Sequence, residues 1–228
     1  RAERTTQLRV SPDGTQLFAF GGTTDITVFQ LDASRPPMTF PGNAGRTVSG
    51  TFSRDGKTLF TVGGDGACIA WDTQTYQQRS SASLISQPVR AIAISPDGST
   101  IAVGADDWKI RLLDSQTLQL IKTIEGAKQH VSGLAHHPPG KIMFSCCRDS
   151  TVQVWDVESG RELAELEGHD DLVLSLAVSP NGKTLATASS DRSVALGDLE
   201  YYTRHIANNS LTWSGPFTEP VVPPDPAD

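Results

Sequence analysis

Residues 131–166 read VSGLAHHPPGKIMFSCCRDSTVQVWDVESGRELAEL, and the order of segments in this stretch decides the fold. Four short apolar segments follow one another at 131–136, 142–146, 151–155 and 161–166. Clusters of proline, glycine, aspartate and serine separate them. Short segments with period-two alternation between such turn signals predict an antiparallel sheet of four strands, because no segment has a sustained helical period.

The same unit recurs along most of the chain. Five turn glycines stand at a constant interval of 42 residues: Gly14, Gly56, Gly98, Gly140 and Gly182. Each glycine ends a near-copy of one tetrapeptide, which reads SPDG in the first unit. A fixed period of this length predicts a repeat architecture. Four-stranded sheets repeated radially form a β-propeller, so we expect an all-β chain with five such blades.

Several recurring residues resemble those of a known family. Two Trp-Asp dipeptides, Trp71-Asp72 and Trp155-Asp156, occupy one slot of the repeat, which elsewhere holds Leu31-Asp32, Leu113-Asp114 and Gly197-Asp198. A Gly-His pair ends at His169. A turn aspartate lies seven residues before each dipeptide aspartate: Asp25, Asp65, Asp107, Asp149 and Asp191. Over about residues 5–207 the chain therefore resembles the WD-repeat β-propeller family.

The recurring aspartates are expected to be structural. An aspartate carboxylate accepts hydrogen bonds from backbone N–H groups of a tight turn. The resemblance implies that it also joins a buried network with a His, a Ser or Thr, and the Trp. No repeat has the whole set, since Ala127 replaces the His beside Ser145, Asn43 replaces it beside Thr61, and Gly197 replaces the Trp near His169. We expect apolar packing or water to substitute, and a fold of ordinary stability.

The blades are expected at about 5–40, 41–82, 83–124, 125–166 and 167–207, followed by a Pro-rich acidic tail or linker at 208–228. Propellers of the family that the chain resembles usually have seven blades, and sometimes six or eight. Three accounts stay open: part of a larger propeller, an open propeller completed by strands of a partner, or closure with five blades. An unclosed ring would expose an apolar face and a strand edge.

Composition excludes several classes of function. The formal net charge is -7 and the basic residues are scattered, which argues against nucleic-acid binding. No apolar run is long enough for a membrane helix. The three cysteines favour a reducing compartment, so we expect a cytoplasmic protein, with the periplasm as the alternative. Nearly every Asp falls in a recurring turn slot, so the convergent carboxylates of a glycoside hydrolase are not expected.

Neither a metal nor a cofactor is expected. Cys146 and Cys147 are neighbours on a predicted strand, so they point to opposite faces and cannot share one ion. His137 replaces the serine of a turn. His136 occupies an inner-strand slot that is apolar in the other repeats, and we expect a hydrogen-bonded core histidine there rather than a pH-sensitive contact.

The candidate partner-binding residues are those that differ in kind between repeats. In relatives such as the G-protein β subunit, contacts flank the start of the inner strand or precede the turn aspartate. These slots, together with the residue after Asp107, give the following set: Arg90, Asp106, Trp108, His130, Arg148, Leu172 and Leu174.

These observations predict a non-catalytic scaffold that binds other protein chains through rigidly presented loops. A sensor or regulatory propeller within a larger enzyme is the first alternative. A five-bladed hydrolase is the second.

Overall fold

The computed structural model describes residues 7–21 and 23–200, which form five antiparallel sheets. Blade 1 contains β1 (Gln7–Val10), β2 (Gln16–Phe20), β3 (Asp25–Gln30) and β4 (Met38–Pro41). Blade 2 contains β5 (Thr47–Phe52), β6 (Thr58–Gly63), β7 (Ala67–Asp72) and β8 (Gln78–Ser83). Blade 3 contains β9 (Val89–Ile94), β10 (Thr100–Ala105), β11 (Lys109–Asp114) and β12 (Leu120–Glu125). Blade 4 contains β13 (Val131–His136), β14 (Ile142–Cys147), β15 (Val152–Asp156) and β16 (Glu162–Leu166).

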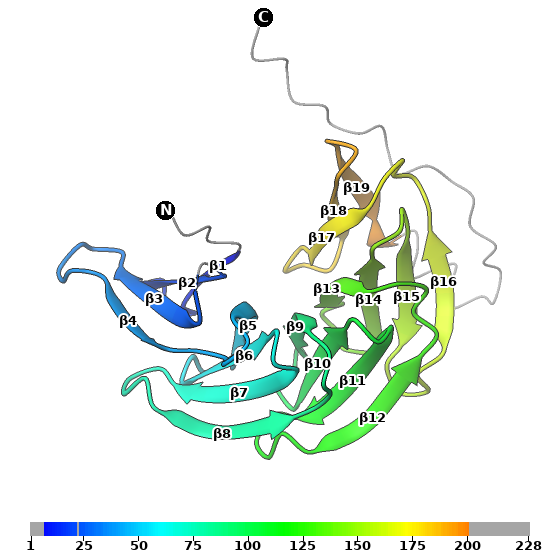
Figure 1. Ribbon diagram of the computed structural model, residues 1–228. Helices are drawn as coiled ribbons and strands as arrows, with labels where there is room; N and C mark the ends of the chain where they lie inside the picture. Colours follow the sequence, from blue (N-terminus) through cyan, green and yellow to red (C-terminus); the bar gives the residue numbers. More distant parts are fainter. Residues whose placement is uncertain (1–6, 22, 201–228) are drawn as a thin grey trace, which may run out of the picture.

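Blade 5 has three strands within the described residues: β17 (Val173–Val178), β18 (Thr184–Ser189) and β19 (Val194–Asp198). In every blade the strands pair in chain order. The inner strands β5, β9, β13 and β17 pack against one another in succession. Figure 1 shows the sheets following an arc, with blade 1 at one end and blade 5 at the other. The all-β, five-bladed propeller predicted from the period is confirmed.

The core consists of apolar clusters at the junctions between consecutive blades. At the junction of blades 3 and 4, Ala102 and Leu112 pack against Met143 and Trp155, and none is more than 4% exposed. Alternate residues of each strand face one neighbouring blade, and the residues between them face the other. Each blade is therefore apolar on both faces, which explains why its strands lack a clean polar face.

The turns that carry the 42-residue period contact one another across the junctions. A Cβ atom at Gly56 would lie 3.5 Å from the ring of Pro12, and one at Gly182 would lie 3.2 Å from Pro138. Both glycines have a positive φ of 70°, which only glycine adopts without strain. In blade 2 the proline is replaced by Arg54, whose Nη1 donates to Pro96 O at 2.9 Å. The repeated tetrapeptide thus forms a contact between units as well as a turn.

The buried polar network of blade 2 is hydrogen-bonded throughout, which corrects the expectation that no repeat completes it. Trp71 Nε1 donates to Thr61 Oγ1 at 2.8 Å, and the Thr61 hydroxyl donates to Asn43 Oδ1 at 2.8 Å. Asn43 Nδ2 then donates to Asp65 Oδ1 at 3.1 Å. A side-chain amide both accepts and donates hydrogen bonds, so Asn43 links Thr61 to Asp65 as a histidine was expected to do.

The networks of blades 4 and 5 are partial. Trp155 Nε1 donates to Ser145 Oγ at 2.8 Å, and Ala127 lies in the apolar cluster of the junction. His169 lies between Asp191 and Thr187, with each of its ring nitrogens 2.8 Å from an oxygen.

Blade 1 departs from the predicted alignment of the repeat. Leu17 pairs with Phe29, as Leu59 pairs with Trp71 in blade 2, so Phe29 and not Leu31 occupies the Trp slot. Asp25 is the exposed first residue of β3, and its N–H donates to Thr23 Oγ1 at 3.2 Å. The prediction that Asp25 is a turn aspartate is therefore wrong. Asp25 lies 40 residues before Asp65 rather than 42, so the predicted alignment of this blade was two residues out of register.

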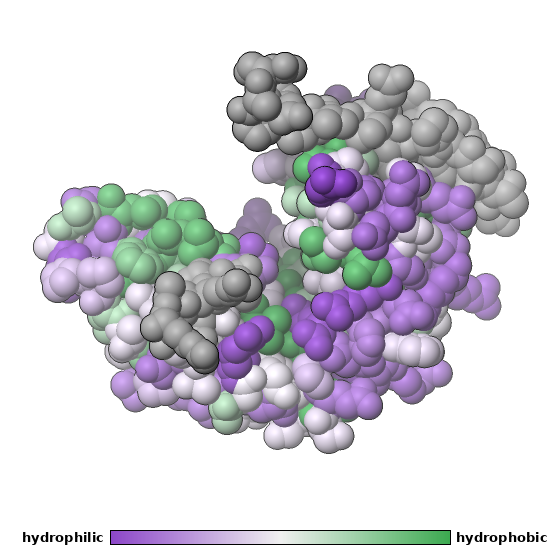
Figure 2. Space-filling model, turned by 45° about the horizontal axis from the view of Figure 1, so that its top comes forward, coloured by the Kyte–Doolittle hydropathy of each residue, from purple (hydrophilic) through white to green (hydrophobic). Residues whose placement is uncertain are grey.

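Apolar side chains are exposed at the blade 1 end of the arc. Leu8 and Val10 are about half exposed, at 51% and 52%, and Phe29 is 37% exposed. In blade 2, residues in the slots of Val10 and Phe29 are packed against blade 1 and buried. Figure 2 shows apolar surface over this end of the molecule. Among the described residues, no helix has the length and apolar character needed to cross a membrane.

Candidate functional site

Five of the seven predicted partner-binding residues lie together on the side of the β10–β11 turn: Arg90, Asp106, Trp108, His130 and Arg148. We call this group the turn-side cluster. Arg90 is the second residue of β9, and its guanidinium binds both carboxylate oxygens of Asp106, with Nη2 to Oδ2 at 2.6 Å. Burial raises the pKa of Asp106, but the hydrogen bonds and charge of Arg90 lower it more, so its carboxylate is ionised. The pair is fixed in a bidentate geometry.

The remaining members surround this pair. His130 Nδ1 lies 3.2 Å from Asp106 Oδ1, and the Trp108 ring meets the His130 ring edge to face at 6.5 Å. Arg148 N donates to His130 O at 3.0 Å, which ties the β14–β15 turn to the segment before β13. The positive charge of Arg148 also lowers the pKa of Asp106. The cluster therefore presents two arginines, a histidine and a half-exposed indole around one buried carboxylate.

Trp108 has a left-handed backbone conformation, with φ at 63°. The same slot holds Gly66 in blade 2 and Arg192 in blade 5, and φ is 73° at both, so the left-handed conformation recurs at this turn of the repeat. A left-handed residue with a Cβ costs about 1–2 kcal/mol, and such outliers concentrate at functional sites. The Trp108 side chain is nevertheless 48% exposed, so packing does not account for it.

Leu172 and Leu174 belong to the next blade, beside the turn-side cluster: Val173, between them, donates its N–H to Asp149 O at 2.9 Å. Leu174, in β17, is 49% exposed and lines a cavity of about 230 Å³ at the centre of the arc. Arg90 lines the same cavity, so it belongs both to the turn-side cluster and to the cavity that Leu174 lines. Leu172 is half-buried, and its carbonyl accepts from Ser190 N at 2.9 Å.

The other predicted turn aspartates differ in what they bind. Asp65, Asp149 and Asp191 each accept a hydrogen bond from the N–H two residues further on, at 3.2, 3.0 and 2.7 Å. Asp107 instead pairs with Arg111 at 2.6 Å. That pair was not predicted, because nothing in the repeat marks Arg111.

Two expectations about histidine and cysteine have different outcomes. Both ring nitrogens of His136 are buried with no hydrogen-bond partner among the described residues, so the predicted hydrogen-bonded histidine is wrong. Burial lowers the pKa of His136 to about 4. Cys146 and Cys147 lie in separate apolar clusters on opposite faces of β14, and burial raises the pKa of both thiols to about 12 and about 11.

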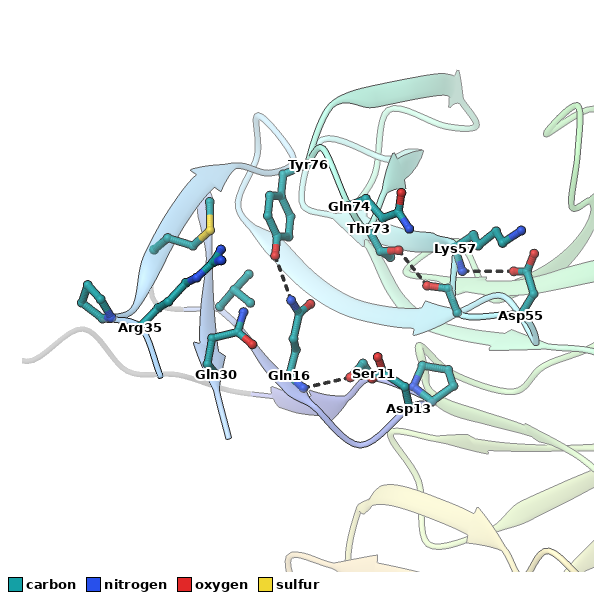
Figure 3. A pocket seen from close by; sticks show the side chains of 15 residues that line it. Ser11, Asp13, Gln16, Gln30, Arg35, Asp55, Lys57, Thr73, Gln74 and Tyr76 are labelled. Carbon is teal, nitrogen blue, oxygen red and sulfur yellow. Dashed lines mark hydrogen bonds between the residues drawn. The ribbon is translucent and has the colours of Figure 1, made fainter. Parts of the chain in front are cut away.

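A second concave site, which sequence reasoning missed, lies between blades 1 and 2. It is a groove of about 510 Å³ on the side of the β1–β2 and β5–β6 turns. Figure 3 shows Tyr76 above Gln16, whose Nε2 donates to the Tyr76 hydroxyl at 3.0 Å. Tyr76 also has a positive φ, of 57°.

The acidic residues of this groove are suited to binding rather than to proton donation. Asp13 Oδ1 accepts from Thr15 N at 3.1 Å, and Asp55 Oδ1 accepts from Lys57 N at 3.0 Å. Hydrogen bonds from neighbouring serine side chains are the main cause that lowers the pKa of both carboxyls. A carboxyl with a lowered pKa is ionised near neutral pH and makes a poor general acid.

Comparison with known proteins agrees with the architecture. A family model described as "WD domain, G-beta repeat" matches residues 34–72, 78–114, 118–156 and 160–197, about two thirds of the chain. The first matched segment begins before β4 of one blade and ends with β7 of the next, so the sequence unit is offset from the blade. A comparison with curated proteins gave no match. The chain belongs to the WD40 family, whose propellers generally serve as protein-interaction scaffolds.

Proposed function

We propose that this protein is a non-catalytic interaction module that binds another protein through the turn-side cluster. The observation that supports this most is Trp108, an exposed indole kept in a strained backbone conformation beside paired charges. Tryptophan and arginine are the residues most enriched in interaction hot spots. The exposed half of this indole offers an apolar surface on which a partner can pack.

The charged members support a preorganised surface. Arg90 is fixed by Asp106, so little side-chain entropy remains to be lost on binding. The Arg148 side chain has no hydrogen-bond partner within the described part of the chain, which leaves its guanidinium available for a carboxylate. The expected partner segment therefore carries an acidic residue and an apolar side chain for Trp108.

Selection from a random displayed peptide library on the full chain tests this proposal. The selected peptides should lose at least ten-fold in affinity for the Trp108→Ala and Arg148→Ala variants. Gln116→Ala, an exposed position on the opposite side of the propeller and outside the groove between blades 1 and 2, is the matched control and should leave their binding unchanged. Peptides that bind both cluster variants as well as the parent chain would contradict the proposal.

A second proposal concerns the blade 1 end of the arc, where a partner sheet would extend the propeller. Its support is the contrast between Val10 and Phe29, which are exposed, and Phe52 and Trp71, which are buried in the same slots of blade 2. A sheet face of this composition is complementary to the face of another blade, because four junctions of this molecule already use that packing. A variant set that tests it is given at the molecular scale in the Discussion.

A further inference from the structure

The groove between blades 1 and 2 has opposite charges at its two ends. Figure 3 shows Arg35 at one end, and Asp13 and Asp55 at the other. Lys57 lies beside Asp55, which leaves that end with one net negative charge. Arg35 is exposed and makes no hydrogen bond or ion pair with other described residues, although its positive charge helps to lower the pKa of nearby Asp32. The charges at the two ends would therefore attract opposite charges on one ligand.

The middle of the groove is lined by amides. Gln16, Gln30 and Gln74 point toward it between the charged ends. The Tyr76 hydroxyl accepts from Gln16, and its own proton stays available to an acceptor. A primary amide donates and accepts at once, which matches the alternating N–H and C=O groups of an extended peptide backbone.

One wall of the groove is apolar. Val28 and Met38 of blade 1 line it, and because Val28 is 1% exposed, the accessible apolar surface of this pair comes from Met38, which is 41% exposed. A methionine side chain adapts its shape to what contacts it. This wall would receive one or two apolar side chains.

A groove of about 420 Å³ also lies at the next junction, and residues in the same slots line it, such as Asp55 and Gln116. Its chemistry differs, because its arginine, Arg79, is paired with Asp72. Leu118 occupies the slot of Tyr76 in blade 3, is 2% exposed and packs into the apolar cluster of blades 2 and 3. The position of the groove therefore recurs between blades, whereas the unpaired Arg35 and the Tyr76 hydroxyl are particular to blades 1 and 2.

We infer that this groove binds a short extended peptide segment with a basic residue at one end, an acidic residue at the other and apolar side chains between them. The acidic residue lies at Arg35 and the basic residue at Asp13 and Asp55. The volume of about 510 Å³ is in the range of sites that enclose small ligands. This site lies on the opposite side of the propeller from the turn-side cluster, so the two are independent.

Nuclear magnetic resonance titration of the ¹⁵N-labelled full chain tests the inference. The probes are two acetylated and amidated pentapeptides, Lys-Leu-Ala-Leu-Glu and its reverse Glu-Leu-Ala-Leu-Lys, with Gln-Leu-Ala-Leu-Gln as the neutral control. One of the two charged probes should bind at least five-fold tighter than the neutral one. The side-chain amide signals of Gln16, Gln30 and Gln74 should shift on binding.

Charge reversal at Arg35 gives the sharper result. The Arg35→Glu variant should lose at least five-fold in affinity for the preferred probe and gain affinity for Lys-Leu-Ala-Leu-Lys. Arg161→Glu, an exposed charge reversal on blade 4, should leave both affinities unchanged. Met38→Ser should weaken binding and Met38→Leu should retain it. Equal affinity for the charged and neutral probes, or an Arg35→Glu variant that binds like the parent, would overturn the inference.

Discussion

At the scale of single residues, Trp108 joins backbone strain to an exposed side chain. Replacement by glycine removes the Cβ that makes φ 63° unfavourable, and the edge-to-face contact with His130 contributes little at an exposed site. We expect Trp108→Gly to unfold at the same or a higher urea concentration than the parent. Trp108→Ala keeps the strain, so it should be about 1 kcal/mol less stable than the glycine variant. A glycine variant less stable than the alanine variant would contradict the claim that the backbone of Trp108 is strained.

His136 provides a pH-dependent prediction at the same scale. Its pKa of about 4 in the folded protein lies below the ordinary value of about 6.5 in the unfolded chain. The unfolded state therefore binds more protons between these values, so stability is complete above about pH 6.5 and falls as the pH drops toward 4. Burial is the main cause of the lowered pKa, and the charge of Asp97 raises it in part. The difference between the folded and unfolded pKa values corresponds to a loss of about 3 kcal/mol in the free energy of unfolding.

Comparison with the His136→Ile variant isolates the pH-dependent contribution of His136 to stability. Isoleucine is chosen because Ile94 occupies the same slot in blade 3. The variant should gain about 1 kcal/mol at pH 7, since it removes two buried nitrogens without partners. Its unfolding midpoint in urea should fall less steeply between pH 6.5 and 4. Parallel pH profiles for the two proteins would exclude His136 as the source.

At the scale of the element, the network of blade 2 depends on the amide of Asn43. Asn43→Ala leaves the Thr61 hydroxyl and the Asp65 carboxylate without their partner, and we expect a loss of about 2 kcal/mol in the free energy of unfolding. Asn43→Asp keeps an acceptor for Thr61 but places a second carboxylate beside Asp65, so it should cost more than alanine. Urea denaturation measures both, and an alanine variant within 0.5 kcal/mol of the parent would show that the network is dispensable.

Elements also show how much the sequence could predict. The period of Gly14 and its counterparts predicted the strands, the blades and the propeller, because each unit repeats both its turns and its alternation. In blade 1 the match to Asp25 and Leu31 was two residues out of the 42-residue register, and Phe29 holds the Trp slot. The spacing placed Asn43 in the histidine slot but did not predict its hydrogen bonds to Thr61 and Asp65. Those bonds depend on contacts between strands, which spacing along the chain does not encode.

At the scale of the whole molecule, differences between repeats predicted one of the two candidate sites but not the other. Residues that vary between repeats at equivalent turns predicted the turn-side cluster, and five of the seven came together. The groove of Figure 3 could not be predicted, because the period marks the turns and not the side chains that line the space between two blades.

The exposed face of blade 1 gives a prediction for the entire chain. Val10→Asp combined with Phe29→Asp should lower the binding of an apolar dye and leave the thermal unfolding midpoint nearly unchanged, because both side chains are already in contact with solvent. The matched control is Phe52→Asp in the same slot as Val10, where the side chain is 8% exposed. It should cost several kcal/mol. A large fall in the midpoint for the blade 1 variant would mean that this face is packed in solution.

The contacts between the proline and glycine of successive turns have a consequence for how such a chain arises. Gly56 meets Pro12 and Gly182 meets Pro138, so each unit carries one half of the contact for its predecessor and the other half for its successor. A tandem duplication of one 42-residue unit within the gene would therefore reproduce every such contact at the new boundary without a compensating mutation. The number of blades is then free to change during evolution while the joint between them is inherited intact.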